Sequence, residues 1–432
     1  MSRVSSIQYA GLPDGDGDPE LVYYNGSIIN NKTQIDTGYD PGVRFIETRD
    51  IPLVKDASKY QFSIVRFTMN GPNKDLPLFI PSIRTGAANP TNNVNLTIYS
   101  VAVDFTFNGT TYGGGAPALT TTFTSTQPVI YSPETLDTTV APVPASTTAQ
   151  TGQDISTRYY WVYTYSWWLQ LVQAALDATT ADIQAQFAVW WAANGGVGPA
   201  PTLAYEPPTL TYNPSNNLFS IYAPANTFGP LPTATGQTSK LYFNENLYGM
   251  FANFKNIYQN LSGERTNEIL IENILYQNLI TVPANFYSAG VPAVQTKYWV
   301  MTQDYESTST LWSPIESIVF TSGLLPVVNE ATSDPIRFGN SNDTVLQTTI
   351  SAFQPIITDV AIPLSSASGY RDFIEYAPTA EYRMASMGRS KTAINNVDIQ
   401  VYWKHRLTGT LFPVQMFNGS SVSIKILLRR VE

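Results

Sequence analysis

Hydrophobic and polar residues alternate over several short runs in the first third of the chain, and this period of two is typical of half-buried β-strands. The run from Tyr60 to Met69 alternates with a single break at Val65. A longer run extends from Leu96 to Phe107, and Asn108-Gly109 follows it as a hairpin turn signal. With a shorter strand over residues 43–49, the first third is expected to be rich in strands.

Short apolar runs return after residue 295 and are separated by turn dipeptides such as Ser368-Gly369 and Asn418-Gly419. Strands are predicted over residues 298–302, 315–320, 345–350, 354–363, 381–387, 397–403 and 422–428. Many short strands with regular turn signals and no helices between them favour an antiparallel sandwich.

The middle of the chain changes to a helical period. Apolar residues recur at helical spacing after Thr157, which predicts a helix that begins there and is capped by Asp154 or Ser156. Two more helices are predicted, over residues 181–193 before Gly195-Gly196 and over residues 245–254 after the cap residue Asn244.

These patterns divide the chain into four parts. Residues 1–42 are polar and turn-rich and read as an N-terminal arm with short strands at most. Residues 43–112 and 295–432 would together complete one β-sandwich, and residues 113–294 would form an inserted domain with helices, opening with an irregular stretch over 113–153. Two β domains in series are the alternative.

Composition removes whole classes of site. The chain has 432 residues, no Cys and one His, which excludes disulfides, thiolate zinc sites, Cys nucleophiles and multi-His metal sites. A formal charge of −9 argues against strong nucleic-acid binding. The N-terminal segment lacks the apolar core of a signal peptide, and no apolar run is long enough for a membrane-spanning helix.

The candidates for chemistry are weak. Asp14, Asp16 and Asp18 are spaced as in a calcium loop, but Pro19 and Asn25 stand where an EF-hand needs Gly and Glu, so a solvated acidic turn is the simpler interpretation. His405 has two cationic neighbours and no nearby Ser or Asp. The sequence contains no phosphate-binding loop and no nucleophile elbow. We therefore expect no enzymatic activity, no cofactor and no metal.

Two charge and aromatic features point to surfaces instead. The densest aromatic cluster is read either as core packing or as a subunit interface, with a glycan platform as a third alternative, and its interface candidates are Tyr159, Tyr160, Trp161, Tyr163, Trp167 and Trp168. Residues 371–432 carry nine Lys and Arg against five Asp and Glu. This excess is read as a solvated strand face, or as a surface toward an acidic neighbour or a packaged genome.

Several segments resemble jelly-roll virion proteins of non-enveloped eukaryotic DNA viruses, and most closely the penton or minor capsid proteins of polinton-like viruses and virophages. They are RFIETRDIPLVKDASKYQFSIVRFTMNGPNKDLPLFIPSI, LTIYSVAV, YYWVYTYSWWLQLV, LYFNENLYGMFANF, LWSPIESIVFTSGLLPV, EYAPTAEYRMASM and NNVDIQVYWKHRLTGTLFPVQMFNGSSVSIKILLRR. Adenovirus penton bases also build one jelly roll from both chain ends and insert a domain between them. Their Arg-Gly-Asp motif has no match here, so integrin binding is not implied.

The resemblance implies a mainly β protein, an antiparallel jelly-roll sandwich built from the N- and C-terminal parts with a mixed, helix-containing insertion. It implies a homo-oligomeric structural protein of the virion that is assembled in the host cell. Its implied partners are neighbouring capsid proteins, and a host receptor is a further candidate. A pentameric penton is the preferred assembly. The alternatives are a double jelly-roll major capsid protein and a glycan-binding or host-attachment module. Only eight charged residues occur between positions 105 and 240, which predicts that neighbouring subunits cover this stretch.

Overall fold

Most of the regular secondary structure in the described part of this chain is β-strand. The computed structural model describes residues 2–10, 19–30, 42–71, 75–84, 95–112, 115–136, 153–203, 205–229, 236–259, 263–272, 279–281, 297–305, 312–332, 352–361, 373–378, 383–388 and 391–431. They divide into two compact units. The first unit combines residues 1–78, 313–365 and 370–432, and the second combines residues 79–312 and 366–369.

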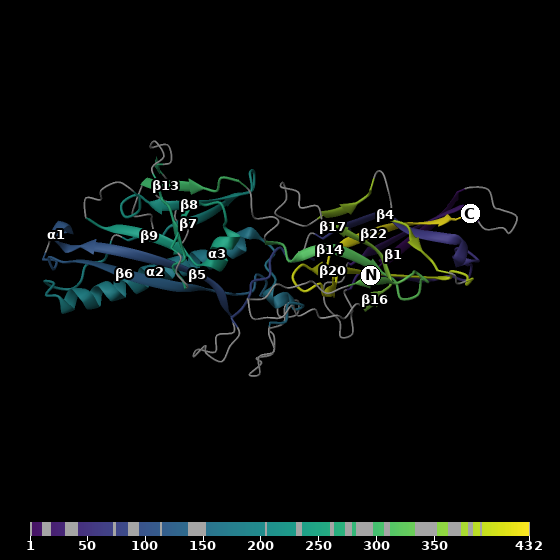
Figure 1. Cartoon of the computed structure of the whole chain (residues 1–432), viewed down its shortest axis with the longest axis horizontal. Helices are drawn as coiled ribbons and strands as arrows, with labels where there is room; N and C mark the ends of the chain where they lie inside the picture. Colours follow the sequence, from purple (N-terminus) through teal and green to yellow (C-terminus); the bar gives the residue numbers. More distant parts are fainter. Residues whose placement is uncertain are drawn as a thin grey trace. The chain divides into compact units, whose positions relative to one another are not determined.

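The first unit contains two antiparallel sheets (Figure 1). One runs in the order β1 (Ser2–Ala10), β2 (Leu21–Ile29), β22 (Ser421–Arg430), β4 (Tyr60–Asn70), β18 (Phe373–Tyr376), and β19 (Ala385–Ser386) also pairs with β4. The other runs in the order β17 (Ile356–Ala361), β14 (Ile315–Thr321), β20 (Asn396–His405), β21 (Leu411–Pro413), and β3 (Arg44–Thr48) also pairs with β20. A short turn of 3₁₀ helix, η1 (Ala57–Lys59), precedes β4, and β15 (Glu330–Thr332) pairs with β16 (Ala352–Gln354).

The core of this sandwich lies between the two sheets. Along β2, Val22, Tyr24, Gly26 and Ile28 are buried while the residues between them are more exposed, which is the alternation that a one-sided sheet requires. Phe67 of β4 meets Phe320 of β14 edge to face, with ring centroids 4.9 Å apart. The aromatic pair joins the sheets across the core.

The second unit contains two further antiparallel sheets and the helices. The five-stranded sheet has the order β10 (Asn256–Tyr258), β11 (Asn267–Ile269), β9 (Thr238–Phe243), β5 (Leu96–Asn108), β6 (Thr120–Ile130). The four-stranded sheet has the order β12 (Leu279–Thr281), β13 (Lys297–Thr302), β8 (Leu218–Pro224), β7 (Thr209–Asn213). The helices are α1 (Gly109–Tyr112), the 3₁₀ turn η2 (Arg158–Tyr160), α2 (Tyr165–Ala193) and α3 (Glu245–Met250).

Helix α2 packs along both sheets of the second unit (Figure 1). Near its start, the ring of Tyr165 lies 4.6 Å from that of Tyr212 in β7. Near its end, Phe187 lies 4.9 Å from Phe107 in β5 and also contacts Phe123 in β6. Because α2 holds two sheets with one apolar face, its packing is expected to dominate the stability of this unit.

The mainly β class and the antiparallel sheets confirm the expected fold class. The strands of residues 60–69, 298–302, 315–320, 397–403 and 422–428 correspond closely to β4, β13, β14, β20 and β22. Asn244 caps α3 as expected, since its side chain accepts from the amide of Leu247. The candidate strand over 345–350 lies outside the described residues.

The predicted helices at 157 and 181 are instead one helix of 29 residues. Its start is later because Val162 exchanges backbone hydrogen bonds with Phe79 and so stays extended, and Thr164 then forms the cap. The two patterns merge because nothing between them breaks a helix. The hydroxyl of Thr179 donates to the carbonyl of Leu176 at 2.6 Å, which satisfies it inside the helix.

Two stretches expected to be irregular contain long strands. In the N-terminal arm, β1 and β2 form a nine-residue pairing, and β2 continues into the sheet through β22. Within residues 113–153, β6 is an eleven-residue strand. β2 is held in the sheet by the distant strand β22, whereas β6 pairs with the preceding strand β5, so in both cases pairing with a partner strand adds to the local propensity.

The second unit begins at Phe79, whereas the sequence placed the insertion at residue 113. The difference is β5, which reads as a continuation of the preceding strands. It pairs with β6 and β9 and has no partner in the sandwich of the first unit among the described strands.

Phe67→Ala is expected to destabilise the first unit by about 3–5 kcal/mol, because it removes a fully buried ring and leaves a cavity against Phe320. Denaturant unfolding followed by tryptophan fluorescence measures this change. Ile51→Ala is the control, since Ile51 is 74% exposed and its loss should cost under about 0.5 kcal/mol. Equal effects of the two substitutions would contradict this packing.

Thr164→Ala is expected to lower the unfolding free energy by about 1–2 kcal/mol. The Thr164 hydroxyl accepts from the amide of Trp167 at 3.2 Å and donates to the carboxylate of Glu134 at 2.9 Å, so its loss uncaps α2 and breaks the anchor to Glu134. Ser166→Ala is the control, because Ser166 lies two residues after Thr164 and its side chain is exposed. It should leave the unfolding free energy within about 0.5 kcal/mol of the wild type. Helical circular dichroism during thermal unfolding compares the two variants.

Candidate assembly surfaces

The structure buries most of the aromatic cluster inside the second unit. Tyr159, Tyr160, Trp161, Tyr163 and Trp168 are all buried, and Trp168 has no exposed surface. Trp167 is half-buried, and its indole N–H donates to the carbonyl of Ser132 at 3.0 Å. Core packing therefore accounts for the burial of five of these six residues within the chain, and the interface role of the cluster stays a prediction.

The buried rings of this cluster are held by hydrogen bonds from their polar atoms. The hydroxyl of Tyr131 donates to the carbonyl of Tyr159 at 2.6 Å, and the indole N–H of Trp161 donates to the carbonyl of Ile155 at 2.9 Å. Burial raises the pKa of Tyr131 well above its usual value, so this hydroxyl stays protonated and keeps donating. The guanidinium of Arg158 lies 5.4 Å from the centre of the Trp161 ring.

The exposed face of α2 is uncharged along its whole length. Positions three and four apart fall on one side of a helix, and here they carry small or uncharged residues. They are Ser166, Gln170, Ala174, Ala178, Ala181, Ala185, Ala188, Val189 and Ala192. The two charged residues of α2, Asp177 and Asp182, are half-buried at its margins. A solvent-facing helix normally carries charges on this side, so the face is unusual for a surface exposed to water.

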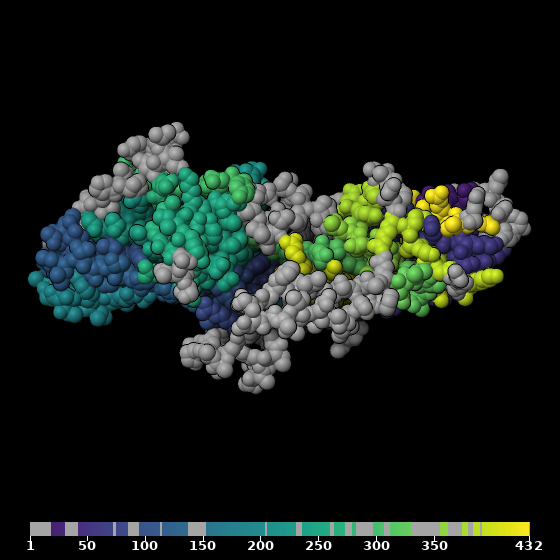
Figure 2. Space-filling model, viewed as in Figure 1, coloured from purple at the N-terminus to yellow at the C-terminus, as the bar shows by residue number. Residues whose placement is uncertain are grey.

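Exposed apolar side chains occur on α2, just after it and at β6 in the same unit. Val189 is 73% and Val197 74% exposed, and Leu119 and Ile130 at the two ends of β6 are each 51% exposed. β6 is also a sheet edge, because β5 is its one partner among the described strands. In the view of Figure 2, residues of α2 form the lower left border of the molecule and no other segment covers them. Edge strands and apolar surface of this kind are suited to pairing with another chain.

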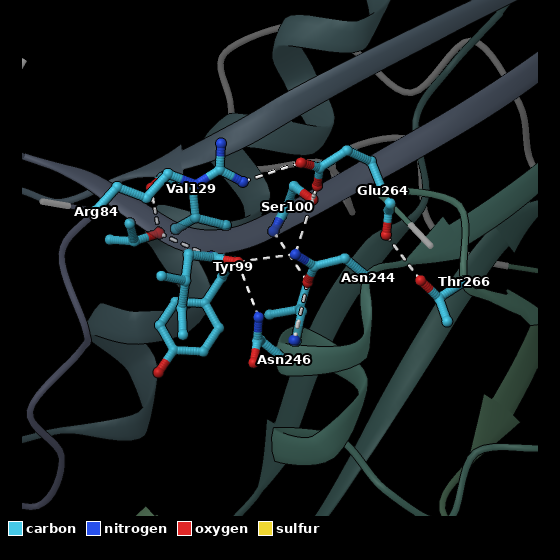
Figure 3. A network of polar contacts seen from close by, with 12 residues as sticks. Arg84, Tyr99, Ser100, Val129, Asn244, Asn246, Glu264 and Thr266 are labelled. Atoms are coloured by element: carbon cyan, nitrogen blue, oxygen red, sulfur yellow. Dashed lines mark hydrogen bonds and ion pairs between the residues drawn. The ribbon is translucent and has the colours of Figure 1, made fainter. Parts of the chain in front are cut away.

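A polar network ties the ends of several elements together in the second unit (Figure 3). The carboxylate of Glu264 accepts from Arg84 at 2.9 Å and from the hydroxyl of Ser100. The side chain of Asn244 accepts from the amide of Ser100 at 3.3 Å and from that of Leu247 at 3.0 Å, and it donates to the carbonyl of Ile98 at 2.8 Å. One amide side chain therefore joins β5 to the start of α3.

The polar groups of this network are hydrogen-bonded to one another. The hydroxyl of Ser100 donates to the carboxylate of Glu264. Glu264 is engaged by Arg84 and by Asn244 at 3.4 Å, so its oxygens serve as fixed acceptors. The arrangement fits the positioning of a loop and a short helix.

The remaining sequence candidates lie elsewhere. His405 is buried at the end of β20, where its Nδ1 lies 3.0 Å from the hydroxyl of Thr408 in a tight turn. Asp14, Asp16 and Asp18 lie outside the described residues. Within the described ranges, no three His, Asp or Glu side chains converge as metal ligands.

The helices that the structure describes include none that is both long and apolar enough to span a membrane.

The alanine face of α2 and the β6 edge were not identified from the sequence. A signal for the first was present, since Ala174, Ala178, Ala181, Ala185 and Ala188 recur at spacings of four and three. The aromatic residues on the opposite face form a stronger pattern, which predicts the side that packs in the core. The edge position of β6 depends on which strands pair, and local sequence does not show this.

Solved virophage proteins share this fold over nearly the whole chain. A chain in the cryo-EM structure of the Sputnik virophage is 25% identical, with a TM-score of 0.69, and the similarity covers 95% of this chain and 98% of that one. The selenomethionine-labelled penton protein of mavirus is 16% identical, with a TM-score of 0.54, covering 95% and 99%. The expected jelly-roll class is thereby confirmed.

Sequence comparison gives the same relationship. The uncharacterized protein V18 of Sputnik virophage is 33% identical over 168 residues, which is 39% of this chain and 87% of V18. The family model for the Sputnik minor capsid protein V18/19 matches residues 22–430. The structural role in a capsid that the sequence predicted is thus supported, and the protein is a virion component. The chain belongs to the Sputnik minor capsid protein V18/19 family.

Proposed function

We propose that this chain forms the penton, a pentameric capsomer at the vertices of an icosahedral capsid. Membership in a minor capsid protein family and a fold shared with the mavirus penton protein support this assignment. In this proposal, the sandwich built from both chain ends forms the capsid wall, and the second unit is the inserted domain. Its partners are four further copies and neighbouring capsid proteins, and a host receptor is a further candidate.

The uncharged face of α2 is the observation that carries the proposal for self-assembly. Leaving this face in water gives no stabilisation, whereas covering it with a neighbouring copy removes apolar surface from water at about 25 cal/mol per Å². Obligate assemblies bury more than about 2,000 Å² and are depleted of charge at their centre. The two half-buried carboxylates of α2 lie at the margin of the face, where a polar rim would be.

We also propose that the role of the chain is purely structural. The Ser100–Glu264–Asn244 network holds β5, α3 and the segment around residue 264 together, and each polar group in it has a geometric task. This use of a Ser and a Glu leaves no free nucleophile–base pair in the network.

The purified chain is expected to form a five-fold oligomer at high concentration, measured by native mass spectrometry and by negative-stain class averages. Ala185→Glu should weaken this oligomer at least tenfold. It places a carboxylate without a partner in the exposed face of α2, which the oligomer would bury. Glu is a good helix former, so the monomer should keep its melting temperature.

Ser215→Glu is the matched control for assembly, because it adds the same charge at an exposed turn between β7 and β8. It should leave the oligomer intact. A three-fold particle would instead favour a major capsid arrangement, and a chain that stays monomeric at all concentrations would contradict the proposal.

Asn244→Ala is expected to destabilise the second unit by about 2–3 kcal/mol, since it removes a helix cap and leaves the amide of Ser100 and the carbonyl of Ile98 without that partner. Glu264→Gln keeps the shape and loses an ion pair between half-exposed groups, so it should cost under about 1 kcal/mol. Differential scanning calorimetry compares the two. A larger loss for Glu264→Gln would mean that the charge, and not the geometry, matters.

A further inference from the structure

The outer face of the sheet β1-β2-β22-β4-β18 carries cations that have no ion-pair partner among the described residues. Phe67 points into the core toward Phe320, so the adjacent Arg66 points to the opposite side of β4. Lys425 is the direct cross-strand partner of Arg66, and Arg429 follows on the same side of β22. These three residues, Arg66, Lys425 and Arg429, are termed the basic strip.

The basic strip contrasts with three ion-paired cations of the first unit. Arg44 pairs with Asp398 at 2.9 Å, Arg383 with Asp359 at 3.1 Å and Lys404 with Glu316 at 3.1 Å. In the described part of the chain, neither Arg66 nor Arg429 forms an ion pair, and Lys425 places its ammonium 4.8 Å from the centre of the Tyr23 ring. Like charges directly opposite each other in a sheet are destabilising, so Arg66 and Lys425 are a cost that folding alone does not explain.

Hydroxyl and amide groups flank the Lys425 end of the strip, whereas Leu21 of β2 is the cross-strand neighbour of Arg429. Asn25 is the cross-strand neighbour of Lys425 on β2, and Ser423 pairs with Thr68 through their hydroxyls at 2.5 Å. Ser27 continues this polar row on β2. Asn, Ser, Thr and Tyr side chains, together with Arg and Lys, are the groups that contact phosphates in protein–DNA interfaces. Glu375 on β18, opposite Thr68, is the acidic residue nearest to this row in the pairing register.

The composition of this face favours a phosphate backbone over a protein as its occupant. A protein interface needs a central apolar or aromatic anchor. Here Leu427 is buried and Tyr23 lies beside Lys425, while the exposed Ile29 stands at the far end of β2. Lys425 and Arg429 are four positions apart on β22, about 13 Å, so the strip is long enough to touch more than one phosphate of a strand.

We propose that the basic strip binds the phosphodiester backbone of nucleic acid, weakly and without sequence preference. Three cations release about three counterions, which predicts a slope of about −2.7 for log affinity against log salt. Binding should therefore fall about 40-fold between 50 and 200 mM monovalent salt. The low charge of the strip agrees with the expectation that strong nucleic-acid binding is absent. The proposal does not depend on the oligomer being a pentamer.

Fluorescence anisotropy with a 30-base-pair DNA duplex and the full-length protein tests the proposal. The variant Arg66→Gln/Lys425→Gln/Arg429→Gln should lose at least tenfold in affinity at 50 mM salt and most of its salt dependence. The control Arg49→Gln/Arg383→Gln/Lys404→Gln removes the same charge from ion-paired positions of the same unit, and it should bind as the wild type does. Arg66→Lys should also retain binding, because phosphate contact needs only the charge.

Three results would overturn the proposal. They are no binding by the wild-type protein at 50 mM salt, equal losses in the strip and control variants, and tighter binding to polyglutamate than to DNA. The last would identify an acidic protein segment as the occupant. Melting temperatures of all variants, expected within about 2 °C of the wild type, exclude unfolding as the cause of a loss.

Discussion

The pairing of β22 between β2 and β4 is the constraint on which the first unit depends. β22 is contributed by the C-terminus, and it forms a nine-residue ladder with one N-terminal strand and a ten-residue ladder with another. Its buried residues Val422, Ile424, Ile426 and Leu428 supply the middle of one core face. Without this strand, β2 and its neighbour β1 would have no link to the rest of the sheet among the described strands. The sandwich therefore closes only when both ends of the chain are present.

This closure explains why a second unit can be inserted without disturbing the first. The insertion leaves after Leu78 and the chain returns at Ser313, so the long excursion is flanked by residues already held in one sandwich. The cost of closing a long loop grows only slowly with its length. Each unit has its own aromatic core, Phe67 with Phe320 in one and the rings around α2 in the other.

The sequence predicted those features whose cause is local. β4 and β20 alternate strongly because one face is buried, and Asn244 could be recognised as a cap because its side chain acts within one turn. The strand β6 was missed although its partner β5 is the preceding strand, and the arm before residue 42 was missed because β2 is held by β22, a partner far away in the chain. The start of α2 was misplaced for the same reason, since Phe79 holds Val162 extended across 83 positions. The sequence identified the aromatic cluster but did not show which of its side chains are buried. Burial depends on how the sheets and α2 pack together.

The low charge of the middle of the chain now has a specific location. The exposed side of α2 carries no charged residue, and alanine stands where an ordinary surface helix has Lys, Glu or Arg. Alanine has the highest helix propensity and no side-chain entropy to lose, so this face favours the helix and a close-packed partner at once. The outer face of the first sheet has the opposite chemistry, with cations left unpaired at an energetic cost. Folding alone explains neither surface, because the face of α2 lacks charge and the face of the sheet concentrates it. Such departures are expected at surfaces that bind a partner.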